Sequence, residues 1–269
     1  MTDKGKKPVK PVTKPFLTGS VTDEQTPMAA LGFFGVLILA AFMTFIVCGA
    51  LTMDSAAVRI ALNAAVEILV LLVMYNSAVH KGAEAVARGE ILYQKQEKGR
   101  EFSASERSIC FHPGKGFVNA LLGTLPVLIC AVILAIVARR QTTGAGSLPN
   151  WLSAYQGRSD ISCALAAYNG NAAMGLEDIL RIVVRVSLMP FVSILGSENP
   201  DGMLTLERLS PVLVLLPAMA YGLGYLRGWQ ERTKIHTGIA ESNTRRARRE
   251  RKARKARMAR TPKGPEQLN

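Results

Sequence analysis

Three polar residues recur every four positions inside a long apolar run of the sequence. They are Arg59, Asn63 and Glu67, within the run from Ala56 to Val79. Because residues four apart lie on one face of a helix, we expect their side chains to form a line. An ionisable group inside a bilayer costs several kcal/mol, roughly 2.5 to 3.5 on insertion scales, unless it is paired or hydrated. This face therefore predicts either a lock between helices or a polar path for an ion, a proton or a lipid headgroup.

The two hypotheses for this face differ in the neighbour that they give to Glu67. As part of a lock, Glu67 pairs with Arg59 through Asn63, or with the arginine at position 181 or 185. As part of a path, its carboxylate lines a polar cavity. The sequence leaves both open.

A second charged set lies in the stretch LEDILRIVVRVSLMPFVSIL, residues 176–195. Its charges recur at about one helical turn, so they form a stripe on a helix whose other positions are apolar. Such a helix is better accommodated in the interface, part way into the membrane or against a polar partner than surrounded by lipid. We expect an amphipathic interfacial or re-entrant helix that Pro190 kinks or ends. The charged residues of this stripe are Glu177, Asp178, Arg181 and Arg185.

The third chemically distinct segment is TRRARRERKARKARMAR, residues 244–260, with ten basic residues and one acid. Its few alanines and one methionine give too little apolar area for insertion, so its binding is expected to be electrostatic. Anionic lipid headgroups offer about 1 kcal/mol per basic residue, RNA phosphates bind through counterion release, and an acidic protein is a third possible partner. No aromatic residues are interleaved for stacking on bases. The basic residues are Arg245, Arg246, Arg248, Arg249, Arg251, Lys252, Arg254, Lys255, Arg257 and Arg260.

Long apolar segments position these charged groups. The chain has 269 residues, 49% of them hydrophobic, a formal net charge of +13 and a mean hydropathy of +0.18. About 20 apolar residues make a helix that crosses a hydrocarbon core of about 30 Å. We therefore predict an all-α polytopic membrane protein with four transmembrane helices and the amphipathic helix in addition. The four spans are expected at about 28–53, 56–80, 117–137 and 208–227.

The distribution of Lys and Arg predicts the orientation. Of the 33 such residues, 26 fall in the segments 1–27, 81–116 and 227–269. Cytoplasmic flanks of membrane helices retain these residues, so all three segments and both termini are expected in the cytoplasm, with the protein in the cell membrane. The segment 138–207 then lies outside. Five spans, with 176–195 crossing, is the alternative. The expected domains are a basic tail 1–27, a membrane domain 28–227 with a cytoplasmic helical segment at 81–116, and a basic tail 228–269.

Local signals refine the helix ends and contacts. The second span is expected to continue as a helix to about Lys98, where Gly99 can cap it, and Ser103 with Glu106 has capping-box spacing. Small residues recur every four positions in the last span and at the start of the third, and small residues let helices approach closely. We expect these two helices to meet, or a homo-oligomer to form. The two sets are Ala220, Gly224, Gly228 and Gly116, Ala120, Thr124.

Catalysis has little support in the sequence. It has no nucleophile elbow, no HExxH, no paired-carboxylate motif and no nucleotide-binding glycine pattern. Its Cys and His residues form no metal-binding motif, and no cofactor is expected. The favoured function is a non-enzymatic scaffold or assembly protein that acts through its basic tail. A transporter or channel subunit using the Arg59, Asn63 and Glu67 face is the first alternative, and a membrane enzyme with an unrecognised site is the second.

Overall fold

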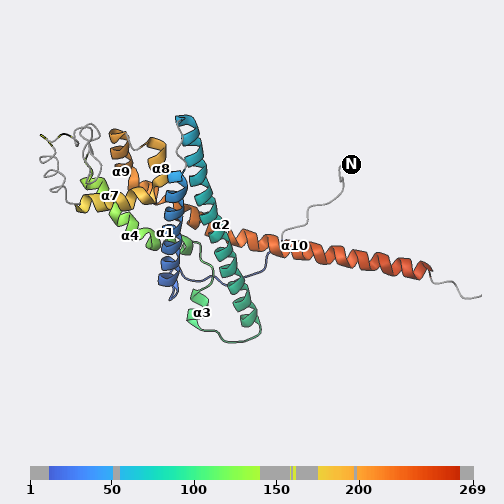
Figure 1. The fold of residues 1–269 in the computed structure, drawn as a ribbon. Helices are drawn as coiled ribbons and strands as arrows, with labels where there is room; N and C mark the ends of the chain where they lie inside the picture. The colour runs from blue at the N-terminus through green and yellow to red at the C-terminus, as the bar shows by residue number, and fades with distance from the viewer. Residues whose placement is uncertain are drawn as a thin grey trace, which may run out of the picture.

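The computed structural model describes residues 12–50, 55–139, 158, 160–161, 175–196 and 199–260, and for 257–260 only the backbone. These residues form helices joined by turns and short irregular segments, without a strand. Figure 1 shows the helices in chain order. They are α1 (Thr26–Ala50), α2 (Ala56–Glu97), α3 (Ala104–Ser108), α4 (Lys115–Val137), α7 (Leu176–Ser187), α8 (Met189–Leu195), α9 (Pro200–Val214) and α10 (Leu216–Arg260).

Four helical segments are long and apolar enough to cross a membrane. They are α1, α2, α4 and the stretch that joins α9 to α10. Large apolar side chains such as Ile38, Leu72 and Ile133 are exposed on their outer surfaces, and contiguous exposed apolar surface on this scale marks a membrane or protein contact. The predicted all-α class with four potential membrane-spanning helices is confirmed.

The second helix extends well past its apolar part. It has 42 residues and ends at Glu97, and Gly99 follows with a φ of +68°. That left-handed conformation has no steric cost for glycine, which explains the stop. The Ser103 hydroxyl then accepts a hydrogen bond of 3.1 Å from the Glu106 amide and starts α3. Both local signals in the sequence predicted these ends.

The stretch 176–195 forms two short helices. The first, α7, has 12 residues, so it is about 18 Å long and shorter than the hydrocarbon core. It stops at Leu188, and α8 begins there with Pro190 in its first turn, a position where the missing N–H of proline has no cost. The stretch therefore does not form a fifth crossing helix. Pro190 starts a second helix where the sequence predicted a kink or an end.

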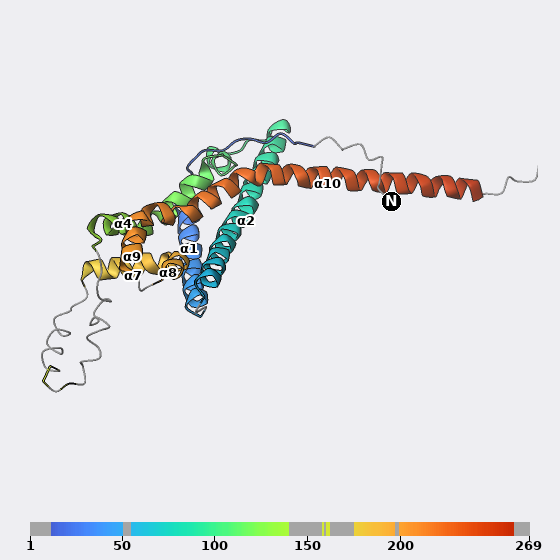
Figure 2. The ribbon, with the colours of Figure 1, turned by 90° about the horizontal axis from the view of Figure 1, so that it is seen from above.

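The last span is broken near its middle. The side chain of Asn199 accepts a hydrogen bond of 2.9 Å from the Gly202 amide and begins α9, eight residues before the span expected at 208–227. The chain breaks at Leu215 and continues as α10, which has 45 residues and is therefore about 68 Å long. In both views α10 crosses α2 and projects far beyond the other helices (Figures 1 and 2).

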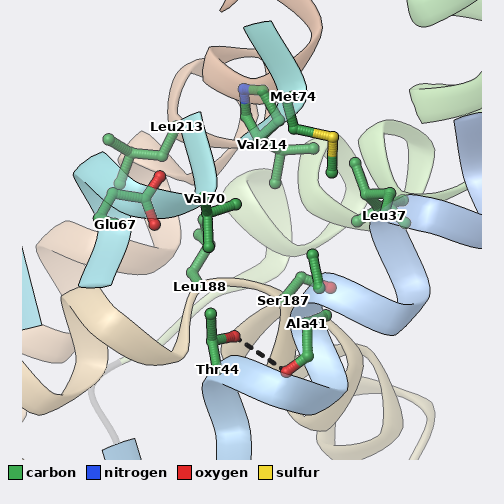
Figure 3. Close-up of a pocket in the computed structure, with 13 residues that line it drawn as sticks. Leu37, Ala41, Thr44, Glu67, Val70, Met74, Ser187, Leu188, Leu213 and Val214 are labelled. Carbon is green, nitrogen blue, oxygen red and sulfur yellow. Dashed lines mark hydrogen bonds between the residues drawn. The ribbon is translucent and has the colours of Figure 1, made fainter. Parts of the chain in front are cut away.

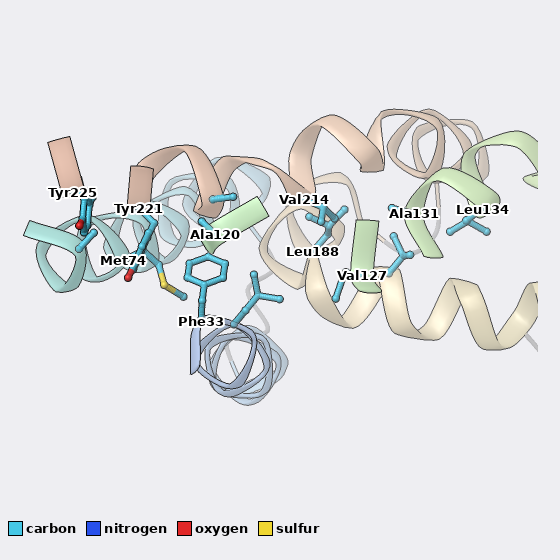
Figure 4. Close-up of a cluster of buried hydrophobic side chains, with 14 of the residues drawn as sticks. Phe33, Met74, Ala120, Val127, Ala131, Leu134, Leu188, Val214, Tyr221 and Tyr225 are labelled. Atoms are coloured by element: carbon cyan, nitrogen blue, oxygen red, sulfur yellow. The ribbon is translucent and has the colours of Figure 1, made fainter. Parts of the chain in front are cut away.

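The core lies where α1, α2, α4 and α10 meet and continues toward α7 and α9 (Figure 4). Phe33 of α1 and Tyr221 of α10 pack edge to face, with ring centroids 4.9 Å apart. Met74 and Ala120 are buried beside them. Small buried residues leave room for the rings, so the four helices close around one apolar centre.

Glycines set the contact between α2 and α10. A Cβ atom on Gly224 would lie 2.2 Å from the Tyr75 carbonyl oxygen, and one on Gly228 would lie 2.4 Å from the Gly82 carbonyl carbon. The expected meeting of α4 and α10 is confirmed, and Gly224 and Gly228 of α10 pack in addition on α2. Where α4 and α10 touch, Gly116 receives the ring of Tyr225.

The basic segments within the described residues gather at one end of the helical body. The Gly19 amide donates a hydrogen bond of 3.0 Å to the Phe111 carbonyl, and the Val12 amide donates one of 3.1 Å to the Thr237 hydroxyl. These bonds tie the N-terminal segment to the α3–α4 connection and to α10. The opposite end carries α7, α8 and α9 beside the last part of α1 and the first part of α2 (Figure 1).

Candidate functional site

The predicted line of Arg59, Asn63 and Glu67 separates into two environments. Asn63 is fully buried, and its side-chain NH2 donates a hydrogen bond of 2.8 Å to the Arg59 carbonyl oxygen. The Arg59 guanidinium lies against Gly196 at the end of α8. Within the described part of the chain, Arg59 Nε and Asn63 Oδ1 are buried without a hydrogen-bond partner. Arg59 thus joins α2 to the end of α8, and neither side chain bonds to the Glu67 carboxylate in the described part of the chain.

Glu67 instead lines a cavity of about 40 Å³ inside the helical body (Figure 3). Side chains from α1, α2, α4, α7, α9 and α10 surround it, and Glu67 is its one ionisable lining residue. The space has room for a few water molecules, since each needs about 10 to 15 Å³. No ion pair joins Glu67 to another described residue, so the predicted pairing with Arg59, Arg181 or Arg185 is wrong.

The rest of the cavity lining is mostly apolar. Two hydroxyl groups, of Thr44 and Ser187, belong to it, but each donates its proton to its own helix, to the carbonyl oxygens of Ala41 and Val183 respectively. Neither hydroxyl donates to Glu67. The carboxylate is therefore the one strong proton or cation acceptor of the cavity, because hydroxyl lone pairs are weaker acceptors than an ionised carboxylate.

A groove on the outside of α1 and α2 adjoins this cavity. It has a volume of about 350 Å³, and residues of both helices line it. Most of these residues are aliphatic, and Met74 and Thr44 are among the others. Four residues, Ala40, Thr44, Val70 and Met74, line both the groove and the cavity. The Glu67 cavity is thus separated from the exposed apolar surface by a single layer of side chains.

The arginines of the charged stripe bind an acid that the sequence reasoning missed. Arg185 Nε donates a hydrogen bond of 3.0 Å to Glu207 Oε1, and Arg181 Nε lies 3.3 Å from the same atom. Arg181 also pairs with Glu177, at 2.5 Å, and donates to the Arg139 carbonyl at 2.9 Å. The carboxylate of Glu207 is almost completely buried, with 2% of the side chain exposed.

Glu207 shows why the stripe is buried between helices. It lies on α9, and its two basic neighbours lie on α7, so the three charges fasten these helices to each other and to the end of α4. Glu207 lies one residue before the span expected at 208–227, so the search for charges inside the spans did not include it. The acid within the apolar sequence LTLERLSPVLVLL was the available signal. The cluster therefore holds helices together, and Glu207 is a polar partner of the kind that the charged stripe was expected to have.

The basic segment continues α10 without interruption. Its side chains are exposed as far as Ala256, and Arg245 and Arg246 make ion pairs one turn away with Glu241 and Glu250. Arginine recurs at every third position from Arg245 to Arg260. Three residues turn a helix by about 300°, which is about 60° short of a full turn. Successive arginines are therefore displaced by about 60° around the axis, and the six positions encircle the helix. The predicted contact residues therefore occupy all sides of α10, without an apolar face.

A buried cluster fixes the base of this basic helix. His236 Nε2 lies 2.7 Å from Glu90 Oε1, and Arg232 makes hydrogen bonds of 3.1 and 3.2 Å with Glu90 Oε2. Glu90 and His236 are both at least nine-tenths buried. The sequence reasoning missed this cluster because its members lie 146 positions apart. It holds α10 against the part of α2 beyond the apolar run.

Metal ligands do not gather in the described part of the chain. No three His, Cys, Asp or Glu side chains there are placed to hold a metal ion. Cys48, Cys110 and Cys130 are free thiols, and burial raises the pKa of the Cys110 thiol, which lies outside the spans. The fourth cysteine, Cys163, lies outside the described residues.

These observations define an all-α protein with four potential membrane-spanning helices, one of which continues as an exposed basic helix. No protein-family model, curated protein sequence or solved structure matches the chain.

Proposed function

We propose that this protein is a non-enzymatic membrane anchor whose basic helix, residues 241–260 of α10, binds the phosphate backbone of RNA in the cytoplasm. The observation that carries the proposal is the continuity of α10, which joins the apolar core at Tyr221 to the arginine-rich segment in one helix. The Glu90 cluster fixes its base. A partner bound to the basic helix is thereby held at a defined place relative to the membrane.

The encircling arginines favour RNA over a flat lipid surface. A helix that lies on a membrane needs one apolar face and one basic face, and the basic helix has cations on every side. Phosphates of a folded or extended RNA can approach from several directions, and their binding releases condensed counterions. Because aromatic residues are absent between the arginines, the contact is with the backbone and does not depend on the base sequence.

A four-residue neutralisation of the basic helix tests this function. In Arg248→Gln, Arg249→Gln, Arg251→Gln and Lys252→Gln combined, RNA affinity is expected to fall about a hundredfold at low salt. The slope of log K against log salt should become shallower by about 3, since each phosphate contact to a single strand contributes about 0.7. The measurement is fluorescence anisotropy of a labelled RNA with the full chain in nanodiscs of zwitterionic lipid, over a range of salt concentrations.

A matched control removes four cations at the same end of the molecule. These are Lys95, Lys98, Arg100 and Arg107, all replaced by glutamine, and the RNA affinity should change by less than threefold. Binding of the intact protein to anionic vesicles but not to RNA would contradict the proposal and favour the lipid partner. If the intact protein bound neither RNA nor anionic vesicles but captured an acidic protein, the third partner expected from the sequence would be favoured.

The Glu67 cavity supports a second candidate function, that of a transporter or channel subunit. Its one strong acceptor, its room for water and its closeness to the apolar groove are features of a site that exchanges a proton or cation. In proteoliposomes with an internal pH dye, Glu67→Gln is expected to reduce any proton flux at least tenfold while the protein still folds. Thr44→Val, in the same lining, serves as the control for a change in polarity alone. Equal flux for Glu67→Gln and the intact protein would exclude this function.

A further inference from the structure

A second, larger pocket opens at the end of the molecule that carries the N-terminal segment and α10. Its volume is about 140 Å³. It is lined by residues just before and in the first turn of α1, by residues of α2 beyond its apolar run, and by residues near the starts of α4 and α10. This is more than three times the volume of the Glu67 cavity. We name it the interfacial pocket, and its lining includes Lys81, Glu84, Arg88, Asn119, Tyr221 and Tyr225.

The interfacial pocket lies at the level where the apolar segments end. The first helix begins at Thr26 and the fourth at Lys115, and the apolar run of α2 ends at Val79, two residues before Lys81. Tyrosines concentrate at the headgroup level of membrane proteins, and Tyr221 and Tyr225 both line this pocket. The pocket is thus placed where lipid headgroups meet the protein.

Lys81 and Arg88 supply the available positive charge of the interfacial pocket. Both side chains are exposed, and neither makes an ion pair with a described residue. Lys81 Nζ lies 5.8 Å from the centre of the Tyr221 ring, a cation–π contact that holds the ammonium at the pocket wall. Glu84 lies between them in sequence.

The other two charges of the lining already neutralise each other. Lys115 Nζ lies 2.5 Å from Asp23 Oδ2, with 7% and 1% of the two side chains exposed. Burial opposes ionisation of Asp23, but the hydrogen bond and the charge of Lys115 hold its pKa below the ordinary value. Counting Glu84 as well, three cations and two carboxylates line the pocket, which leaves one positive charge.

Asn119 provides an unused acceptor in the same lining. Only 6% of the residue is exposed, and its Oδ1 atom is buried without a hydrogen-bond partner among the described residues. An unpaired buried acceptor is unfavourable and is normally satisfied by protein, water or ligand. The amide therefore indicates a bound group that donates a hydrogen bond.

We propose that the interfacial pocket binds the headgroup of an anionic glycerophospholipid. Its phosphodiester lies between Lys81 and Arg88, and a headgroup hydroxyl donates to Asn119 Oδ1. One negative charge on the ligand matches the one excess positive charge of the lining, and a headgroup with its own ammonium does not. This site is separate from the basic helix and does not depend on the function proposed for it.

Native mass spectrometry of the full chain, titrated in detergent with phosphatidylglycerol, tests the site. The intact protein is expected to retain one tightly bound lipid, and the combined variant Lys81→Ala and Arg88→Ala should bind it about tenfold more weakly, because two charge-assisted contacts are lost. The control variant Lys98→Ala and Arg100→Ala, with two exposed cations at the same end, should bind like the intact protein. The four-residue variant of the basic helix should also bind phosphatidylglycerol like the intact protein. This result would separate the lipid-binding proposal from the RNA-binding proposal.

A second variant changes the acceptor and keeps both cations. Asn119→Asp places a carboxylate beside the phosphate, and we expect phosphatidylglycerol to bind at least tenfold more weakly than to the intact protein. Equal affinity of the intact protein for phosphatidylethanolamine and phosphatidylglycerol would overturn the proposal. So would displacement of the bound lipid by inorganic phosphate, or unchanged phosphatidylglycerol binding in the Lys81 and Arg88 variant.

Discussion

Glu207→Gln is expected to destabilise the protein by about 3 to 5 kcal/mol, the range found when one partner of a buried ion pair is removed. The Glu207 side chain is 2% exposed and contacts both Arg181 and Arg185. Glutamine has nearly the same shape, so the change removes the charge and leaves the packing. The two guanidinium groups then remain in a largely apolar setting, with less negative charge around them.

The measurement is the midpoint of thermal unfolding of the detergent-solubilised protein, determined by size-exclusion chromatography of heated samples. The exposed Glu101→Gln is the matched control and should leave the midpoint unchanged. Replacing all three members, by Glu207→Leu, Arg181→Met and Arg185→Met, should recover much of the loss, because apolar residues of similar volume replace buried ion pairs well. A single Glu207→Gln variant as stable as the parent would show that the cluster does not hold α7 to α9.

Gly224→Leu is the second change with a large expected effect. Even a Cβ atom at this position would lie 2.2 Å from the Tyr75 carbonyl oxygen, which backbone atoms of α2 cannot avoid by a change of rotamer. The two helices must separate, so we expect a loss of about 3 kcal/mol or more, at or beyond the upper end of overpacking effects. Gly224→Ala should already lower stability for the same reason.

Gly238 offers a control within the same helix. A Cβ atom there meets no other atom within 4 Å, and glycine inside a helix is less favourable than alanine by about 0.5 to 1 kcal/mol. Gly238→Leu should therefore leave the unfolding midpoint unchanged or raise it, although the added side chain is the same. Equal loss in both variants would mean that helix–helix contact does not explain the effect at Gly224.

The two buried charge clusters lie at opposite ends of the molecule. The Glu207 cluster fastens α7 and α9 at one end, and the Glu90 cluster fastens α10 to α2 at the other. The Glu67 cavity lies between them, where six helices converge. A change in the Glu207 cluster can therefore be tested for its effect on folding at a distance from the proposed RNA and lipid contacts, which lie at the other end.

The sequence was sufficient for the features that depend on neighbouring residues alone. Apolar runs of more than about 20 residues predicted the four long helices, and single residues such as Gly99 and Ser103 predicted where helices end and begin. The charged stripe at 176–195 predicted a helix that does not cross, and α7 has that character. Hydrophobicity and backbone preference act over a few residues, so their pattern along the chain is enough.

The partners of the buried charges required the tertiary structure. The four-residue spacing placed Glu67 on one face with Arg59 and Asn63. In the structure Arg59 lies against the end of α8, Asn63 bonds to its own helix, and Glu67 lines a cavity shared by six helices. The stripe arginines bind Glu207, and Glu90 binds His236, 146 positions away. Spacing fixes which face of one helix a side chain occupies, whereas the helix that covers that face depends on how all the helices pack, and a local pattern contains no information on that.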